Sequence, residues 1–229
     1  QMCIRDRYTH NCVVQASCMV DVPHVGAFLL GAPKCGTTWL AEALTQHPEL
    51  CVSDPKEPNI LATHKGTFGR DVSEPDWSAY ADCFNGGGLR IDCSVHAMAC
   101  PVAPSRVVAN WPDARLIVCL REPVSRTVSH WNMILDTKED QENEVDWSDF
   151  ESAWADSRLS ADTLYGAAIS RWLQHFDRGS ILLIEANRMR HEPMVVLEEV
   201  CSHLTISSHS FELDSVPVSY THLTLPTKA

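Results

Sequence analysis

A run from Phe28 to Leu40, FLLGAPKCGTTWL, combines a lysine, two glycines and two threonines between an apolar segment and a helical pattern. The apolar residues predict a strand, and the spacing of the apolar residues after the threonines predicts a helix. The loop between them would present backbone N–H groups at a helix N-terminus, which is a favourable place for an anion. The candidate binding residues are Lys34, Cys35, Gly36, Thr37, Thr38 and Trp39.

The loop is similar to the P-loop of nucleoside-triphosphate-binding proteins, but it differs at the decisive position. Gly31 and Gly36 have the P-loop separation, and Thr38 stands where the magnesium-binding hydroxyl would be. Thr37 occupies the lysine position, and the lysine is instead inside the loop, at position 34. A nucleotide kinase or another P-loop phosphotransferase stays as an alternative, as does a plain βα turn that binds nothing.

A second strand, turn and helix follow an almost continuous apolar segment, residues 114–120. Arg121 ends the segment, Pro123 suits the first turn of a helix, and Ser129 comes eight residues after the arginine. Arginine offers a two-pronged donor to a phosphate, and serine offers one hydroxyl. Taken alone, an arginine at a strand end more often forms a surface ion pair. The presence of the first anion loop favours a phosphate site here.

Together these motifs resemble sulfotransferases that use 3′-phosphoadenosine 5′-phosphosulfate (PAPS). The segment PKCGTTWL resembles their 5′-phosphosulfate loop, and Arg121 with Ser129 resembles their 3′-phosphate site. The segment KEPNIL, residues 56–61, resembles the KEPHFF-like segment of heparan-type glycan sulfotransferases, which places Glu57 at the proposed general base. Asn59 and Cys93 stand where that family has a histidine and a lysine.

The resemblance implies a three-layer, P-loop-like α/β domain with a central parallel sheet flanked by helices. It implies direct in-line transfer of a sulfuryl group from PAPS to a hydroxyl or amine, expected to belong to a carbohydrate, with no metal required. Glu57 would be the base, and Lys34 would stabilise the leaving phosphate. Cys35 also suggests a thiol phosphatase, but Ala41 stands where those enzymes have an arginine. A non-catalytic nucleotide-binding fragment is a further alternative.

Composition limits the function classes. The 229 residues carry a net charge of −12, which argues against a nucleic-acid-binding surface and requires any anion site to gather its cations in one groove. No run is apolar enough to span a membrane, so we expect a membrane anchor only upstream of this chain. The resemblance favours the Golgi for a eukaryotic protein and the cytoplasm for a bacterial one.

Ten cysteines are present, at irregular spacing. A zinc site from Cys83, Cys93, His96 and Cys100 is disfavoured because paired Cys-x2-Cys spacings are absent. A disulfide among Cys83, Cys93 and Cys100 stays open.

The remaining pattern predicts the other elements of the domain. We expect the sulfotransferase-like domain to span residues 25–206, truncated at its C-terminus, and residues 1–10 and 218–229 to be non-native, because they resemble translated sequencing adapters. Residues 62–88 are expected to be a surface excursion anchored by Trp77, Tyr80 and Phe84. A short helix is expected over 150–158, and a core-facing stripe is expected from Leu164, Ala168, Trp172, Leu173 and Phe176.

Overall fold

The structure is a computed structural model, and it describes residues 22–62, 74–137 and 145–216. Five strands form one sheet in the order β2-β3-β1-β4-β5, and each neighbouring pair is parallel. The strands are β1 (Ala27–Gly31), β2 (Leu50–Val52), β3 (Leu89–Asp92), β4 (Arg115–Leu120) and β5 (Ile181–Glu185). The expected parallel α/β sheet is therefore confirmed.

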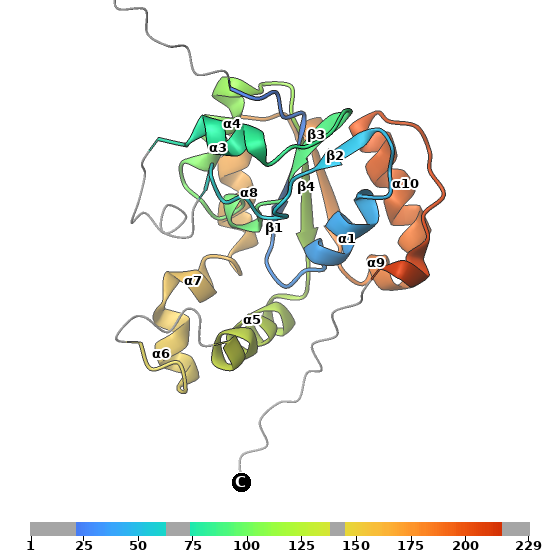
Figure 1. Cartoon of the computed structure of the whole chain (residues 1–229). Coiled ribbons are helices and arrows are strands. Elements are labelled where there is room, and N and C mark those ends of the chain that lie inside the picture. Colours follow the sequence, from blue (N-terminus) through green and yellow to red (C-terminus); the bar gives the residue numbers. More distant parts are fainter. Residues whose placement is uncertain (1–21, 63–73, 138–144, 217–229) are drawn as a thin grey trace, which may run out of the picture.

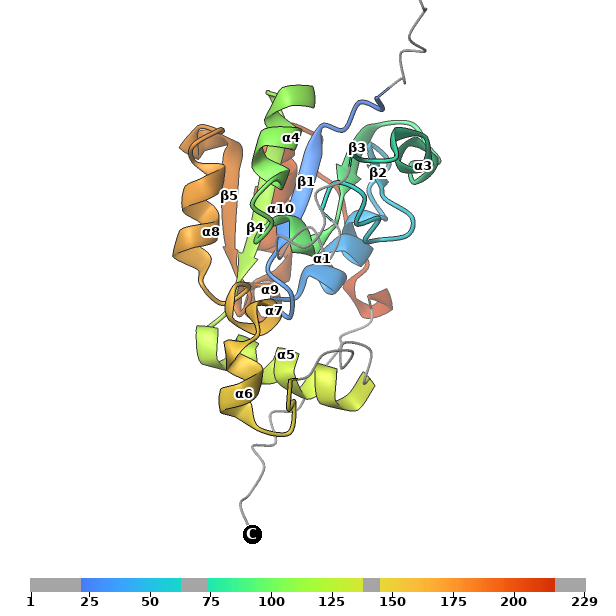
Figure 2. The same ribbon diagram turned by 90° about the vertical axis from the view of Figure 1, so that its left-hand side faces the viewer.

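Helices cover both faces of the sheet. They are α1 (Thr37–Leu44), α3 (Trp77–Asp82), α4 (Ala103–Asn110), α5 (Pro123–Thr137), α6 (Phe150–Ala155), α7 (Ser157–Ser160), α8 (Tyr165–Trp172), α9 (Arg188–His191) and α10 (Pro193–Leu204). Three short 3₁₀ turns are η1 (Val95–Ala97), η2 (Arg178–Ser180) and η3 (Leu213–Ser215). Figures 1 and 2 show α1 and α10 on one face and α4 and α8 on the other, which gives the three expected layers. Helices α5, α6 and α7 lie beyond the carboxyl ends of the strands.

The two apolar segments form the centre of the sheet. β1 is buried along its whole length, and β4 pairs with it from Ala27 opposite Arg115 to Gly31 opposite Val118. Strands covered by helices on both faces are nearly continuously apolar, and this explains why both were visible in the sequence. Because both strands run parallel, the loops that follow them emerge at the same edge of the sheet.

The surface excursion expected at residues 62–88 is only partly right for residues 74–88, because most of them are exposed but a helix, α3, forms within the segment. Asp76 caps α3 by accepting from the Ala79 amide at 3.0 Å, and Tyr80 on that helix is fully buried. The Tyr80 hydroxyl donates to Asp92 at the end of β3, at 2.7 Å. The ring of Trp77 meets Trp111 edge-on, so the aromatic residues anchor this segment to the core, as expected.

Two further expectations need correction. The helix expected over 150–158 is divided into α6 and α7, with Asp156 in extended conformation between them. In the stripe on α8, Ala168, Trp172 and Phe176 are buried as expected, whereas Leu164 and Leu173 are 57% and 42% exposed. These two leucines stand at the caps of a helix that is shorter than the pattern suggested.

The expected non-native ends, residues 1–10 and 218–229, lie outside the described residues. Within the described ranges, none of the helices combines the length and the apolar character that crossing a membrane requires.

Candidate active site

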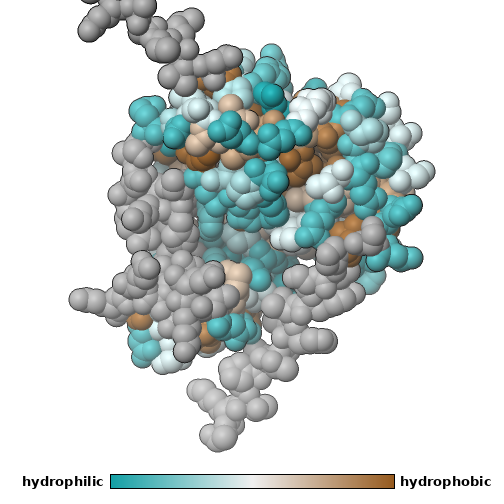
Figure 3. Space-filling view, viewed as in Figure 1, coloured by the Kyte–Doolittle hydropathy of each residue, from teal (hydrophilic) through white to brown (hydrophobic). Residues whose placement is uncertain are grey.

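A cleft of about 520 Å³ lies at the carboxyl ends of the strands. Its walls come from the loop after β1, the turn after β2, η1, the end of β4, α5, the turn and helix after β5, and η3. In Figure 3 the surface between the sheet body and α5 is recessed and mainly hydrophilic. The lining includes the predicted residues Lys34, Cys35, Gly36, Thr37, Thr38, Trp39, Glu57 and Arg121.

The loop after β1 has the backbone shape of an anion cradle. Lys34 and Gly36 both have positive φ, 66° and 83°, and Gly36 is the N-cap of α1. The first turn of α1 carries no acidic residue, so the partial positive charge of the helix terminus is not offset there. The Cys35 amide donates within the loop to Ala32, at 3.3 Å, so the amides of Gly36, Thr37 and Thr38 are the better anion donors.

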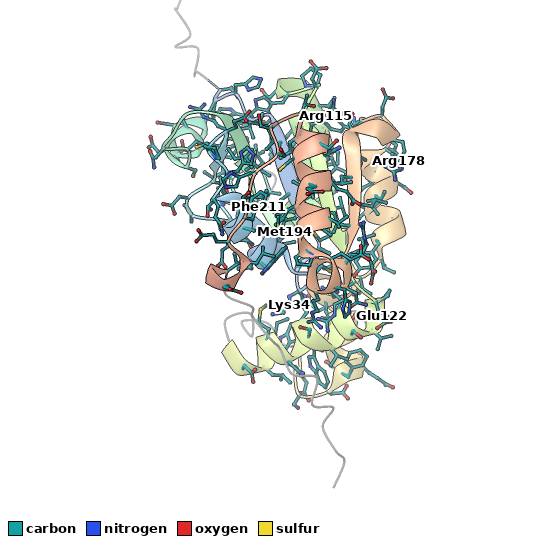
Figure 4. All side chains as sticks on the ribbon, turned by 90° about the vertical axis from the view of Figure 1, so that its right-hand side faces the viewer. Lys34, Arg115, Glu122, Arg178, Met194 and Phe211 are labelled. Carbon is teal, nitrogen blue, oxygen red and sulfur yellow. The ribbon has the colours of Figure 1, made fainter. Side chains whose placement is uncertain are left out.

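Lys34 and Arg121 come from different strand–loop–helix units and meet in the cleft. Arg121 Nη1 donates to the Lys34 carbonyl at 3.5 Å, and Lys34 Nζ lies 3.5 Å from Met133 Sδ on α5. Burial, followed by the nearby Arg121 cation, lowers the pKa of Lys34. Figure 4 shows Lys34 facing α5, at the opposite end of the strands from Arg115 and Arg178. Two cations that line one cleft and interact electrostatically suit a ligand with more than one negative charge.

The surroundings of Cys35 are not those of a nucleophilic cysteine. Its Sγ atom lies 3.7 Å from the Pro33 carbonyl and 3.7 Å from the Tyr165 hydroxyl, which in turn donates to the Arg121 carbonyl at 3.0 Å. Burial raises the pKa of the Cys35 thiol, although Tyr165 and the arginines nearby act in the other direction. A buried thiol with a raised pKa is a poor nucleophile, so Cys35 is better explained as loop packing.

Glu57 is presented by a rigid turn after β2. Its Oε1 accepts from Lys56 Nζ at 2.5 Å, and both side chains are partly exposed. The turn is tied to the sheet, because the Lys56 carbonyl accepts from the Ser53 hydroxyl at 2.8 Å and the Asn59 amide donates to Ser94 at 3.0 Å. Asn59 sits at φ 52°, and its side-chain amide donates back to the Glu57 carbonyl at 3.3 Å, so it supports this turn.

Ser129 lies on α5 next to a residue of the cleft wall, but the Ser129 side chain is 1% exposed and does not line the cleft. Its expected contact with a 3′-phosphate stays a prediction. The neighbouring His130 does line the cleft, as does His96 from η1.

A buried polar cluster behind this wall was not expected from the sequence. Arg126 is fully buried and donates to His130 Nδ1 at 3.0 Å and to the Leu159 carbonyl at 2.8 Å. Because a guanidinium only donates, Nδ1 accepts and the neutral imidazole carries its proton on Nε2. Asp162 Oδ2 lies 3.9 Å from Arg126 and 3.8 Å from His130, and burial raises the pKa of Asp162 to about 6. The pKa of Arg126 is lowered by the same cause, so burial outweighs their mutual attraction.

The charges of the lining differ sharply from those of the chain as a whole. Lys34, Arg121 and Arg190 are its strong cations, and Glu57 is the carboxylate among the described lining residues. A chain of net charge −12 thus gathers positive charge in this one cleft, which is the condition that an anionic ligand requires.

The segment after β5 supplies lining residues that sequence reasoning missed. Asn187, Met189, Arg190 and Pro193 all face the cleft. The sequence does not reveal this role, because no spacing rule connects these residues to a loop that lies about 150 positions earlier in the sequence.

Comparison with known proteins decides the family. The family described as "Sulfotransferase domain" matches residues 26–221. This chain belongs to that family. The match covers most of the chain, including both anion loops and the Glu57 turn, so the domain is a sulfotransferase domain. The resemblance of the two loops to those of PAPS-dependent sulfotransferases is therefore confirmed by the family match.

Similar curated proteins include heparan sulfate glucosamine 3-O-sulfotransferase 3B1 of Mus musculus, 26% identical over 181 residues that cover 76% of this chain and 44% of the relative. Bifunctional heparan sulfate N-deacetylase/N-sulfotransferase 4 of Mus musculus is 26% identical over 203 residues, 81% of this chain and 23% of the relative. The chain thus spans less than half the length of these relatives.

Solved structures share the fold. A sulfotransferase from Alicyclobacillus acidocaldarius aligns with a TM-score of 0.70 and 24% identity, covering 86% of this chain and 87% of the other. The mouse sulfotransferase SULT7A1 complexed with PAP aligns with a TM-score of 0.52 and 19% identity, covering 83% of this chain and 61% of the other. The P-loop-like fold expected from the sequence is confirmed.

The cysteines considered for zinc or a disulfide are separate buried thiols in this fold. Cys83, Cys93 and Cys100 are free, and burial raises the pKa of each. Across residues 22–62, 74–137 and 145–216, three or more metal-ligating side chains do not come together at any point.

Proposed function

We propose that this domain transfers a sulfuryl group from PAPS to a hydroxyl or amine of a carbohydrate acceptor. The observation that carries the proposal is the convergence of Lys34 and Arg121, from two separate anion loops, on one cleft that also contains Glu57. A donor that is anionic at both its 5′ and 3′ positions needs two such loops. The heparan sulfate enzymes among the relatives support a carbohydrate acceptor.

In the proposed reaction the chain binds the donor without a covalent intermediate. The N–H groups of Gly36, Thr37 and Thr38, with Lys34, hold the 5′-phosphosulfate, and Arg121 holds the 3′-phosphate. Lys34 also stabilises the negative charge that grows on the bridging oxygen as the bond from sulfur to phosphate oxygen breaks. The nucleotide leaves as 3′-phosphoadenosine 5′-phosphate (PAP).

Glu57 acts on the acceptor side. Its carboxylate takes the proton of the acceptor group while the acceptor atom forms the new bond to sulfur. Oε1 already accepts from Lys56, so Oε2, to which none of the described side chains donates, is the oxygen assigned to the acceptor. The ties through Ser53, Asn59 and Ser94 keep this oxygen in place.

The P-loop phosphotransferase alternative fits the cleft less well. A kinase needs a lysine at position 37 and a carboxylate for magnesium at a strand end, whereas Thr37 is at the helix start and Glu57, the carboxylate among the described lining residues, lies in the turn after β2. We also propose Golgi residence for a eukaryotic source and cytoplasmic residence for a bacterial one.

The experiment separates binding from chemistry. Arg121→Ala should weaken PAP binding by about 10- to 100-fold, since charge-assisted contacts contribute about 1.5–3 kcal/mol. Glu57→Gln should slow single-turnover transfer by about 10²–10⁴-fold with little change in PAP affinity. Affinity is measured by titration calorimetry, and transfer is measured with sulfur-labelled PAPS and a heparan-type oligosaccharide.

Two matched controls belong to this experiment. Arg115 also makes one contact of 3.5 Å to a backbone carbonyl, that of Gly179, but lies at the opposite end of the strands, so Arg115→Ala should leave PAP affinity unchanged. Glu198 is exposed on α10, so Glu198→Gln should leave transfer unchanged. A Glu57→Gln protein with parental turnover would remove Glu57 from the mechanism.

A further inference from the structure

Helix α9 is very short for an element that forms a wall of the cleft. It has four residues. The Arg190 and His191 amides donate to the Asn187 carbonyl at 3.0 and 3.2 Å, and the Glu192 amide donates to the Arg188 carbonyl at 2.7 Å. Isolated helices of this length are unstable, because few hydrogen bonds compensate the entropy lost in forming the first turn. Tertiary contacts must therefore hold α9 in place.

One contact joins α9 directly to the anion loop. Met189 is 6% exposed, and its terminal methyl lies 2.8 Å from the point where a Cβ on Gly36 would be. The methionine thus covers Gly36, where a glycine is favoured by the positive φ. A displacement of α9 would therefore change the packing of Met189 on Gly36, the N-cap of α1.

A second contact joins α9 to α10. Arg188 Nη1 and Nη2 donate to the two carboxylate oxygens of Glu199, at 2.9 and 2.6 Å. Its Nε atom also lies 3.6 Å from Glu192. The hydrogen bonds between them raise the pKa of Arg188 and lower the pKa of Glu199, so both groups stay charged. A two-pronged pair of this kind fixes orientation as well as distance.

We propose that Arg188 is a positioning residue of the nucleotide site. Through its fork to Glu199 it holds α9 so that Asn187, Met189 and Arg190 form one wall of the cleft against the anion loop. Loss of the fork should lower affinity for the nucleotide and leave the rate of transfer from bound donor nearly unchanged. This inference rests on the proposed function for its ligand, but the Arg188–Glu199 pair, called the clamp below, is a property of the free protein.

The test uses Arg188→Ala, Glu199→Gln and the double variant, with Arg178→Ala as the matched control. Arg178 donates to the Ile181 carbonyl at 2.6 Å and lies at the far end of the strands from Lys34. Hydrogen exchange in the nucleotide-free protein should accelerate over residues 186–193 in the three clamp variants and stay parental there in Arg178→Ala.

The second measurement is PAP affinity. Each clamp variant should bind PAP about 3- to 30-fold more weakly, and the double variant should be no weaker than Arg188→Ala, because the two residues act through each other. Transfer at saturating PAPS should stay within about twofold of the parent. Parental exchange over 186–193 in Arg188→Ala, or parental PAP affinity with accelerated exchange, would overturn the proposal. If the parent itself fails to bind PAP, the proposed function fails, and the exchange data alone decide whether Arg188 holds α9.

Discussion

Gly31 and Gly36 stand at the two ends of the anion loop, and alanine at these positions should destabilise the fold by different amounts. Gly36 has φ 83°, and the atom nearest to an added Cβ is the terminal methyl of Met189, at 2.8 Å. That methyl ends a flexible side chain and can move, so the cost is mainly the left-handed backbone, about 1–2 kcal/mol. Gly31 has φ 130°, and its Cβ would lie 2.6 Å from the Val95 carbonyl oxygen and 3.3 Å from Met98 Cβ. The Val95 carbonyl belongs to the backbone, which shifts less easily than the end of a flexible side chain.

For Gly31→Ala the backbone strain of about 1–3 kcal/mol adds to an overpacking cost of about 1–3 kcal/mol, which gives about 2–6 kcal/mol in total. At about 2–4 °C per kcal/mol for a chain of this size, the melting temperature should fall by about 2–8 °C for Gly36→Ala and by about 4–24 °C for Gly31→Ala. Gly87 has no atom within 4 Å of its Cβ position, so Gly87→Ala is the control and should stay within about 1 kcal/mol of the parent. Thermal unfolding of all three is the assay. A Gly31→Ala protein as stable as Gly87→Ala would refute the account of the loop.

Three other outcomes follow from titratable groups of the site. Burial raises the pKa of Asp162 from 3.8 to about 6, so the folded parent loses stability as pH rises from about 4 to 7. Over that range the free energy of unfolding of Asp162→Asn, measured with urea, should increase relative to that of the parent by on the order of 3 kcal/mol. Because burial raises the pKa of Cys35, iodoacetamide should leave that thiol unmodified in the folded protein near neutral pH and modify it after unfolding, and rapid labelling of the folded protein would contradict its assignment to packing. Because burial and Arg121 lower the pKa of Lys34, PAP affinity should decline with rising pH before an ordinary lysine would titrate, and Arg121→Ala should move that decline to higher pH in calorimetric titrations.

The parts of the fold that could be predicted from sequence are those governed by local pattern. β1 and β4 are buried on both faces, so their apolar runs were continuous, and each is followed by a loop whose residue types favour an anion. The position of Glu57 came from a resemblance in its segment, and the structure places it in the same cleft.

The unpredicted parts depend on contacts between distant segments. The hydrogen bond from Tyr80 to Asp92 joins α3 to the end of β3, and the cluster of Arg126, His130 and Asp162 joins α5 to the turn after α7. Polar residues at such positions look like surface residues in the sequence, since only the tertiary fold shows that they are buried together. The wall formed by α9 was missed for the same reason, because Met189 has a role only when Gly36 lies beneath it.

The most direct test of the account is a competition between PAP and ATP for the parent protein, each titrated with and without magnesium. Lys34 inside the loop, Thr37 at the P-loop lysine position and Arg121 at the second anion loop all favour a nucleotide that carries a 3′-phosphate. We therefore expect PAP to bind more tightly than ATP, with an affinity that magnesium does not increase. Stronger binding of ATP that depends on magnesium would contradict the assignment of this cleft to PAPS.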